Sequence, residues 1–154
     1  MTVADTSPMT RSRKVLANQA WESALTAHAV LMRRFAAEDV WHGLSMREYD
    51  VLYTLSKCDG PLRIGDLGRH VLLSQPALSR LVERLVERNL LFRCADPGDA
   101  RAAHISLTTA GRALQREIGL THGEAVAHAM TAALTDQELR LLENLTTKLT
   151  QEAS

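Results

Sequence analysis

Polar and basic side chains recur between residues 74 and 84 at intervals that place them on one face of a helix. The set is Ser74, Gln75, Pro76, Ser79, Arg80 and Arg84. The amide of Gln75 and the hydroxyl of Ser79 can hydrogen-bond the edges of base pairs. Arg80 can reach guanine or phosphate, and Arg84, one turn further on, can reach the phosphate backbone. The chemistry that this face predicts is recognition of double-stranded DNA in its major groove.

The helix that carries this face is predicted to span residues 74–88. Ser74 suits the N-cap position, and Pro76 lies in the first turn, where its missing N–H is tolerated. Apolar residues follow at intervals of three and four and form the opposite, buried face: Leu78, Leu81, Val82 and Leu85. Asn89 tolerates a left-handed backbone and marks the end of the helix.

A tight hairpin is predicted directly after this helix. Two short strands, residues 90–95 and 104–108, flank the turn sequence Asp96-Pro97-Gly98-Asp99. Arg101 is expected to enter a minor groove of DNA, and Asp99 could hold its guanidinium by a charge-assisted hydrogen bond. The alternative is a solvated hairpin with ordinary turn residues.

Helices are predicted on both sides of this region, over residues 14–38, 45–57, 63–71, 108–134 and from 135 onward. Ser45 with Glu48, and Thr135 with Glu138, have the spacing of capping boxes. A narrow leucine stripe on the last helix suggests packing against another helix or another subunit; it comprises Leu139, Leu142, Leu145 and Leu149.

The predicted fold class is mainly α with a small β-hairpin wing. It is a winged helix-turn-helix with N- and C-terminal dimerisation helices, in which one helix lies in the groove and the hairpin lies alongside. Residues 1–44 would form the N-terminal part of the dimerisation region, residues 45–110 the DNA-binding lobe and residues 111–154 the C-terminal dimerisation helices. Together they would make one compact domain.

The overall charge argues against a non-specific polyanion binder, because 18 Lys and Arg balance 18 Asp and Glu. Between residues 61 and 107, seven basic residues face five acidic ones, so affinity would depend on two half-sites read together. Arg63 is among the seven and joins the candidate DNA-binding residues. No apolar run is long enough to cross a bilayer and no secretory signal is recognisable, so we expect a cytoplasmic protein.

The stretch from residue 64 to 114 closely resembles the MarR family of transcription regulators. It reads IGDLGRHVLLSQPALSRLVERLVERNLLFRCADPGDARAAHISLTTAGRAL and includes a D-P-x-D-x-R wing followed by L-T-x-x-G. The resemblance implies a homodimer with interlaced terminal helices, bound to a pseudo-palindromic operator and usually acting as a repressor that an effector releases. By position, the residues named above for the helix and for the wing match those of the family. Asn89 departs from the glycine that is usual there.

The same resemblance implies an effector site, because family members often bind small aromatic or phenolic acids between the dimer helices and the DNA-binding lobe. Candidate lining residues are Trp21, His28, Trp41, Tyr49 and Tyr53; the alternative is that they are simply core. A urate-responsive subgroup of the family has a tryptophan, an acidic residue and an arginine at similar places. In this sequence Trp21, Asp50 and Arg93 could take their roles. Urate is not favoured, since Leu81 replaces a further arginine of that subgroup.

Other chemistries find little support in the sequence. The six histidines lack HxxxH spacing, so no metal and no cofactor are expected. Cys58 and Cys94 lack CxxC spacing and read as structural thiols, with a redox role left open. No nucleophile elbow, phosphate loop or paired acid motif predicts an enzyme. The competing class is a winged-helix module that binds protein rather than a specific DNA sequence.

Overall fold

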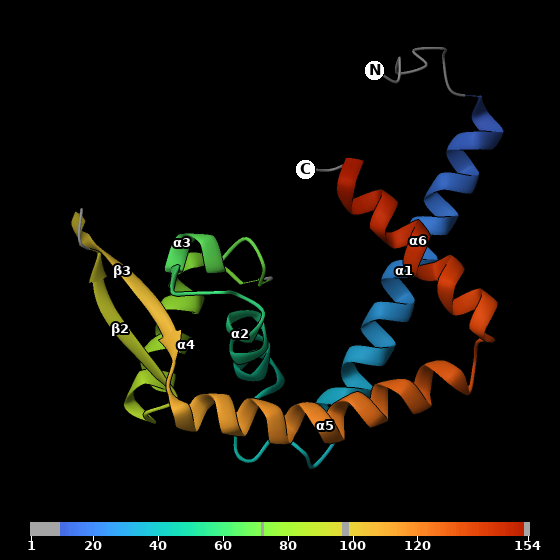
Figure 1. The fold of residues 1–154 in the computed structure, drawn as a ribbon. Helices are drawn as coiled ribbons and strands as arrows, with labels where there is room; N and C mark the ends of the chain where they lie inside the picture. The colour runs from blue at the N-terminus through green and yellow to red at the C-terminus, as the bar shows by residue number, and fades with distance from the viewer. Residues whose placement is uncertain (1–9, 72, 97–98, 153–154) are drawn as a thin grey trace. The chain divides into compact units, whose positions relative to one another are not determined.

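The computed structural model describes residues 10–71, 73–96 and 99–152, without the side chains of residues 96, 99–102 and 152. Its elements in chain order are α1 (Arg11–Ala36), α2 (Met46–Ser56), β1 (Leu62–Arg63), α3 (Ile64–Leu67), α4 (Gln75–Glu87), β2 (Leu91–Asp96), β3 (Asp99–Leu107), α5 (Thr109–Thr131) and α6 (Asp136–Glu152) (Figure 1). The chain forms two compact units, one ending at Ala37 and the other beginning at Glu38. The predicted class, mainly α with a small β wing, is confirmed. The three-part division at residues 44 and 110 stays a prediction.

The sheet is larger than the predicted hairpin. β2 and β3 pair antiparallel, with Cys94 opposite His104, and β1 adds a third strand on the other side of β3. In β1, Leu62 pairs with Ile105 and Arg63 with His104. A helix expected from residue 63 therefore begins only at Ile64 and ends at Leu67. Two residues are too few to show the alternating pattern of a strand, so the sequence did not predict β1. Gly65 and Gly68 disfavour helix, so α3 is shorter than expected.

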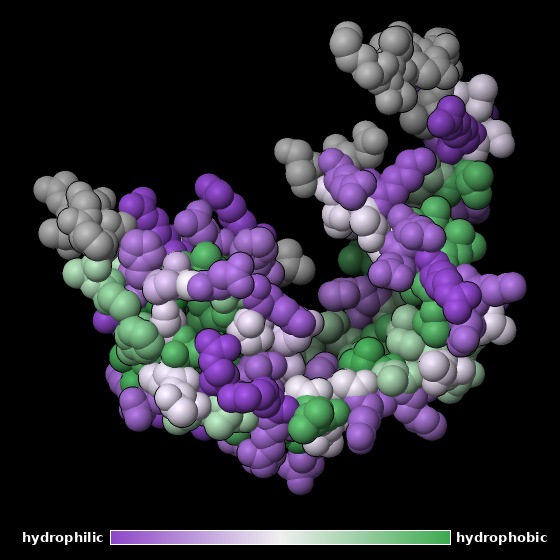
Figure 2. All heavy atoms as spheres, in the orientation of Figure 1, coloured by the Kyte–Doolittle hydropathy of each residue, from purple (hydrophilic) through white to green (hydrophobic). Residues whose placement is uncertain are grey.

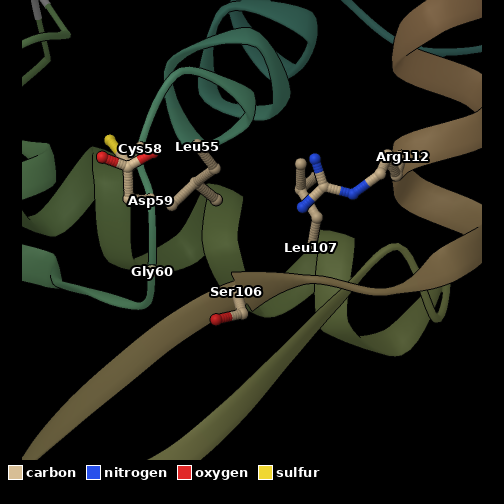
Figure 3. Close-up of a pocket in the computed structure, with 7 residues that line it drawn as sticks. All are labelled: Leu55, Cys58, Asp59, Gly60, Ser106, Leu107 and Arg112. Atoms are coloured by element: carbon tan, nitrogen blue, oxygen red, sulfur yellow. The ribbon is translucent and has the colours of Figure 1, made fainter.

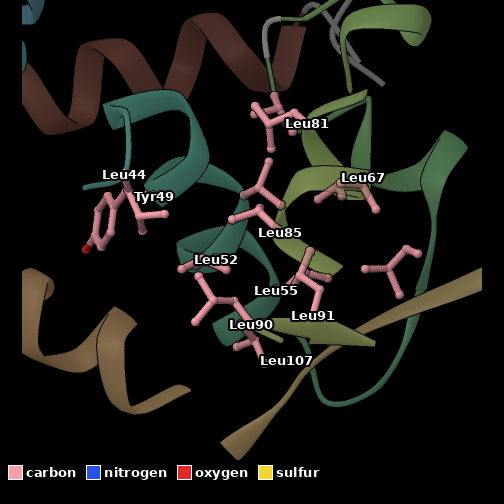
Figure 4. Packing of buried hydrophobic residues seen from close by; sticks show 14 of the residues in the cluster. Leu44, Tyr49, Leu52, Leu55, Leu67, Leu81, Leu85, Leu90, Leu91 and Leu107 are labelled. Atoms are coloured by element: carbon pink, nitrogen blue, oxygen red, sulfur yellow. The ribbon is translucent and has the colours of Figure 1, made fainter. Parts of the chain in front are cut away.

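The core of the second unit lies between α2, α4, the sheet and α5 (Figure 4). The predicted inner face of α4 is confirmed: Leu78, Val82 and Leu85 are fully buried, and Leu81 is 4% exposed. Leu52 of α2, Leu91 of β2 and Ile118 of α5 are also fully buried. Each such side chain contributes about 1.5–3 kcal/mol through burial, so this packing sets the position of α4.

Local capping chemistry sets the ends of the helices. Both predicted capping boxes form: Ser45 exchanges hydrogen bonds with Glu48, and Thr135 with Glu138. Asn89 has φ 58°, the left-handed conformation expected after α4. Thr108 caps α5 by accepting from the Gly111 N–H at 2.9 Å, while its hydroxyl donates to the Asn89 carbonyl at 2.8 Å. The turn after α4 is thereby joined to the start of α5.

Candidate nucleic-acid interface

The outer face of α4 is polar and basic where the helix begins. Gln75, Pro76 and Arg80 are exposed, and Ser79 is half-buried. Ser74 has the extended backbone of an N-cap residue, with φ −67° and ψ 151°, yet its hydroxyl makes no capping hydrogen bond. Hydroxyl and helix N–H groups at this end can therefore bind a phosphate. The first two turns of α4 present the groups that base and phosphate contacts require.

A hollow of about 500 Å³ lies beside these turns, and residues of α3, α4 and all three strands line it. The lining residues are Arg63, Ile64, Gly65, Asp66, Arg69, Gln75, Ser79, Arg93 and Ala103. Arg63, Gln75 and Ser79, all predicted DNA-binding residues, thus meet at one surface. Arg93 lies here, with Nη2 3.8 Å from Glu83 Oε1, although the sequence suggested it for the effector site.

Arg69 was missed as a candidate for this surface. Its side chain is 80% exposed, and its Nη1 lies 3.3 Å from Asp66 Oδ1. No motif distinguished it from other basic residues, because its place beside Gln75 depends on the turn between α3 and α4.

The second half of α4 and its C-cap residue, Arg88, make hydrogen bonds to the segment around the start of α2. Arg84 Nε donates to Glu48 Oε1 at 3.2 Å, and Arg88 Nη1 donates to the Gly43 carbonyl at 2.9 Å. The Arg84 side chain remains 55% exposed, whereas that of Glu48 is 10% exposed. Arg84, predicted to contact the DNA backbone, therefore also holds α4 against the start of α2.

Glu48 stays ionised because its hydrogen bonds outweigh its burial. Burial raises the pKa of this carboxyl, but the Ser45 N–H, the Ser45 hydroxyl and the Arg84 guanidinium lower it, and the net pKa is below the ordinary 4.5. A carboxyl whose pKa is lowered by folding stabilises the native state above its unfolded pKa. That contribution is lost as the pH falls through the folded value.

We expect Glu48→Gln to lower the free energy of unfolding by about 1–2 kcal/mol at neutral pH, because glutamine can still cap α2 but cannot pair ionically with Arg84. The difference from the unchanged protein should shrink as the pH falls from 4.5 through the lowered folded pKa. Urea unfolding across this pH range measures it. Glu83→Gln is the control, since its pair with Arg93 is exposed and should contribute under about 0.5 kcal/mol. A pH-independent loss would contradict the role of the charge.

The predicted wing is β2 with β3, and its strands keep register except for an irregularity at Ala95 and Asp96. The tip, Pro97 and Gly98, lies outside the described residues, as do the side chains of Asp99 and Arg101. The suggested hydrogen bond between these two side chains therefore stays a prediction.

An aromatic cluster joins α2, the segment before it and α5. The Trp41 ring lies 5.5 Å from that of Tyr49 and 4.9 Å from that of His122, and the Tyr49 and Tyr53 rings are 6.0 Å apart. A pocket of about 410 Å³ opens beside this cluster, here called the α2–α5 pocket. Its lining residues are Tyr49, Asp50, Tyr53, Gly119, His122, Gly123 and Val126. Three of the predicted effector residues, Tyr49, Asp50 and Tyr53, thus line one pocket.

The ionisable groups of this pocket are partly desolvated. Burial raises the pKa of Asp50, an effect that the His122 imidazole and the Arg47 guanidinium oppose. Burial likewise raises the pKa of the Tyr49 phenol. His122 Nδ1 lies 3.4 Å from Glu38 Oε2, so this imidazole is near two carboxyl groups. Sequence reasoning missed His122 because the residues it meets lie more than 70 positions earlier.

The other predicted effector residues lie elsewhere. Trp21 and His28 belong to α1, where both are exposed, and Trp21 is 65% exposed. Trp41 is buried in the aromatic cluster behind the α2–α5 pocket. The predicted effector residues that the structure brings together are therefore Tyr49, Asp50 and Tyr53 of α2, with Trp41 packed against Tyr49.

Cys58 borders a small hollow with Asp59, Ser106 and Arg112 (Figure 3), and its thiol donates to the Thr54 carbonyl at 3.4 Å. Cys58 and Cys94 are both free and half-buried.

Among the residues that the structure describes, no three His, Cys, Asp or Glu side chains converge as metal ligands. None of the described helices has the length and apolar character needed to span a membrane.

Together, the short α3, the two-faced α4 and the antiparallel hairpin define a winged helix-turn-helix protein. The MarR family model matches residues 42–102. The transcriptional regulator MhqR of Bacillus subtilis (strain 168) is 31% identical over 101 residues, which cover 65% of this chain and 68% of that one. The chain belongs to the MarR family of transcription regulators.

Solved structures share this fold. Sco3205, a MarR family regulator from Streptomyces coelicolor solved with DNA, matches with a TM-score of 0.76 at 21% identity, covering 97% of this chain and 92% of that one. BpsR of Bordetella bronchiseptica, whose DNA binding is regulated by 6-hydroxynicotinic acid, matches with a TM-score of 0.69 at 24% identity, covering 88% and 98%. These likenesses confirm the winged helix-turn-helix arrangement.

Proposed function

We propose that this regulator is a homodimer that binds a pseudo-palindromic operator and represses transcription until a small effector releases it. The observation that carries the proposal is the outer face of α4, where Gln75 and Ser79 line one hollow with Arg63 and Arg93. Arg80, the next residue of this helix, is exposed. These groups suit base edges and phosphates. Sco3205, which shares the fold, was solved in complex with DNA, and this supports DNA binding by the present chain.

Two copies are needed because one such face carries few basic groups. A dimer would place two α4 helices in adjacent major grooves about 34 Å apart, with Arg101 of each wing in a flanking minor groove. Such a regulator would work in the cytoplasm without catalysing a reaction. The chain would divide into a lobe for DNA, residues 45–110, and dimerisation regions on either side.

Exposed apolar side chains on the terminal helices support dimerisation (Figure 2). On α1 they are Val15, Leu16, Trp21, Leu25 and Val30, and on α6 they are Leu141, Leu142, Leu145 and Leu149. Several large apolar side chains exposed on one helix are typical of a surface that another subunit covers. A second copy of the chain would cover it.

We expect Leu145→Glu to give a monomer, because a charge would replace a leucine that is 53% exposed and proposed to face the partner. Light scattering measures the mass in solution. Thr147→Glu, an exposed polar position of the same helix, is the control and should leave the dimer intact. Removing the chain from Thr135 onward should also abolish the dimer. A folded dimer after either change would contradict the assignment of α6.

Release of DNA has a structural route through α2. This helix carries Glu48, which holds Arg84 of α4, and directly after it Tyr49 and Asp50, which line the α2–α5 pocket. A ligand in the pocket that favours one position of α2 would change the position of α4. Such a ligand acts only through a difference in affinity between the two arrangements.

The test of DNA binding is fluorescence anisotropy of the full chain with the DNA upstream of its own gene. We expect binding at least about 10³-fold tighter than to a scrambled duplex, in the range typical of specific regulators. Equal affinity for both duplexes would favour the protein-binding module instead.

A further inference from the structure

The charge around the α2–α5 pocket is acidic rather than basic. Asp50 is the carboxyl group among its lining residues, and none of the described lining residues is lysine or arginine. Two positive groups act from nearby: Arg47 and, when protonated, His122 interact with Asp50. His122 Nδ1 also lies 3.4 Å from Glu38 Oε2, so this imidazole interacts with a second carboxyl group. A carboxylate entering the pocket would therefore meet Asp50 as a like charge.

The walls of the pocket are aromatic. The rings of Tyr49, Tyr53 and His122 line it, with Tyr49 and His122 5.8 Å apart and nearly edge to face. Faces of electron-rich rings attract organic cations, and the attraction grows when the site is partly desolvated. Asp50 is half-buried, so its carboxyl is partly removed from water. The ring faces and the carboxyl group of Asp50 thus both favour a positively charged ligand.

Glycines leave room for a flat ring on the α5 side. Gly119 and Gly123 are one turn apart on α5, and both line the pocket. A Cβ atom at Gly123 would meet nothing within 4 Å, whereas one at Gly119 would lie 3.1 Å from the Tyr49 hydroxyl. A side chain larger than alanine at position 123 would therefore extend into open space of the pocket.

Basic side chains line a different hollow. Its lining residues are Tyr53, Ser56, Lys57, Arg112, Gln115 and Arg116. Lys57 Nζ lies 5.0 Å from the Tyr53 ring centroid. Tyr53 lines both this basic hollow and the α2–α5 pocket, and of the two the basic hollow is the one whose own lining offers lysine and arginine to an aromatic acid.

We propose that the α2–α5 pocket binds an aromatic cation, a ring bearing an amine or quaternary ammonium group, with the positive group beside Asp50 and the ring against Tyr49 and Tyr53. As an effector class this rests on the proposed function, but the binding itself does not require DNA. It differs from the aromatic acids that the family resemblance suggests.

Calorimetric titration of the full-length protein with three probes that share a phenyl ring and differ in charge tests the proposal: benzyltrimethylammonium, benzyl alcohol and benzoate. We expect the cation to bind at least about tenfold more tightly than benzoate. Asp50→Asn should weaken the cation about tenfold and leave benzyl alcohol unchanged. Asp59→Asn, an exposed aspartate just beyond α2, is the matched control and should change neither.

A second variant keeps the test decisive if Asp50→Asn does not fold. Gly123→Leu should fill the pocket and abolish binding of the cation, while circular dichroism shows an intact helical protein. Benzoate binding as tightly as the cation, no binding of the cation, or cation binding unaffected by either variant would overturn the proposal. DNA binding is measured separately, so a protein that binds the cation but no operator would contradict the regulator function and leave the ligand class standing.

Discussion

Gly111→Ala is expected to prevent stable folding. An added Cβ would overlap the carbonyl oxygen of Leu90, and it would also lie 2.9 Å from the carbonyl carbon. These atoms cannot move aside easily, because the same carbonyl accepts from the Thr108 N–H at 3.1 Å and Leu90 itself is buried. The start of α5 would have to separate from the turn after α4. We expect a loss of at least about 3 kcal/mol, a large part of the stability of an ordinary domain.

Thermal and urea unfolding followed by circular dichroism measure this loss. Gly123→Ala is the matched control, because it is the same change on the same helix with nothing within 4 Å of the added atom. It should raise stability by up to about 1 kcal/mol, since alanine favours helix. Equal stability of the two variants would show that α5 and the turn are not packed as described.

Arg80→Ala should cause the largest loss of DNA binding among the described residues of α4. The Arg80 side chain is exposed one turn into the helix. Arg84 and Arg88, further along, are instead hydrogen-bonded to Glu48 and to the Gly43 carbonyl. Each lost contact should cost about 1–3 kcal/mol, and a dimer loses two. If Arg80 binds guanine, discrimination at one base pair of each half-site should also relax. If it binds phosphate, affinity should fall for all sequences and the salt dependence should weaken.

Anisotropy titrations at several salt concentrations separate these two roles. Arg140→Ala, which removes the same charge from the exposed surface of α6, is the control and should change affinity little. Unchanged operator affinity in Arg80→Ala would remove this residue from the interface. The corresponding Arg101→Ala change in the wing is expected to cost about 1–3 kcal/mol by the same reasoning.

Sequence periodicity was sufficient for the features that depend on neighbouring residues. The two faces of α4, the capping boxes of α2 and α6 and the left-handed Asn89 follow from residues within four positions of each other. The strand β1 could not be predicted, because its two residues gain their structure from pairing with β3, some 40 positions later. In the sequence, Gly111 stands out only as part of the family motif L-T-x-x-G. The structure gives the reason for glycine, because the Leu90 carbonyl occupies the place of a Cβ atom.

The candidate sites divide in the same way. Gln75, Ser79 and Arg80 were identified because one helix presents them together. Arg69, His122 and the pairing of Arg84 with Glu48 depend on contacts between separate elements, the last across 36 positions. Arg93, a candidate for the effector site, lines the hollow with Gln75 and Ser79 instead, because strand register, which the sequence leaves open, decides which surface its side chain joins.

The measurement that tests the central claim most directly is methylation interference on the operator. Methylation of guanine N7 blocks an acceptor in the major groove, where α4 is proposed to lie. We predict interference at two clusters of guanines centred about one helical turn apart, and loss of that pattern in Gln75→Ala and Arg80→Ala. Binding that tolerates methylation of every major-groove guanine, while specific affinity persists, would contradict recognition through α4.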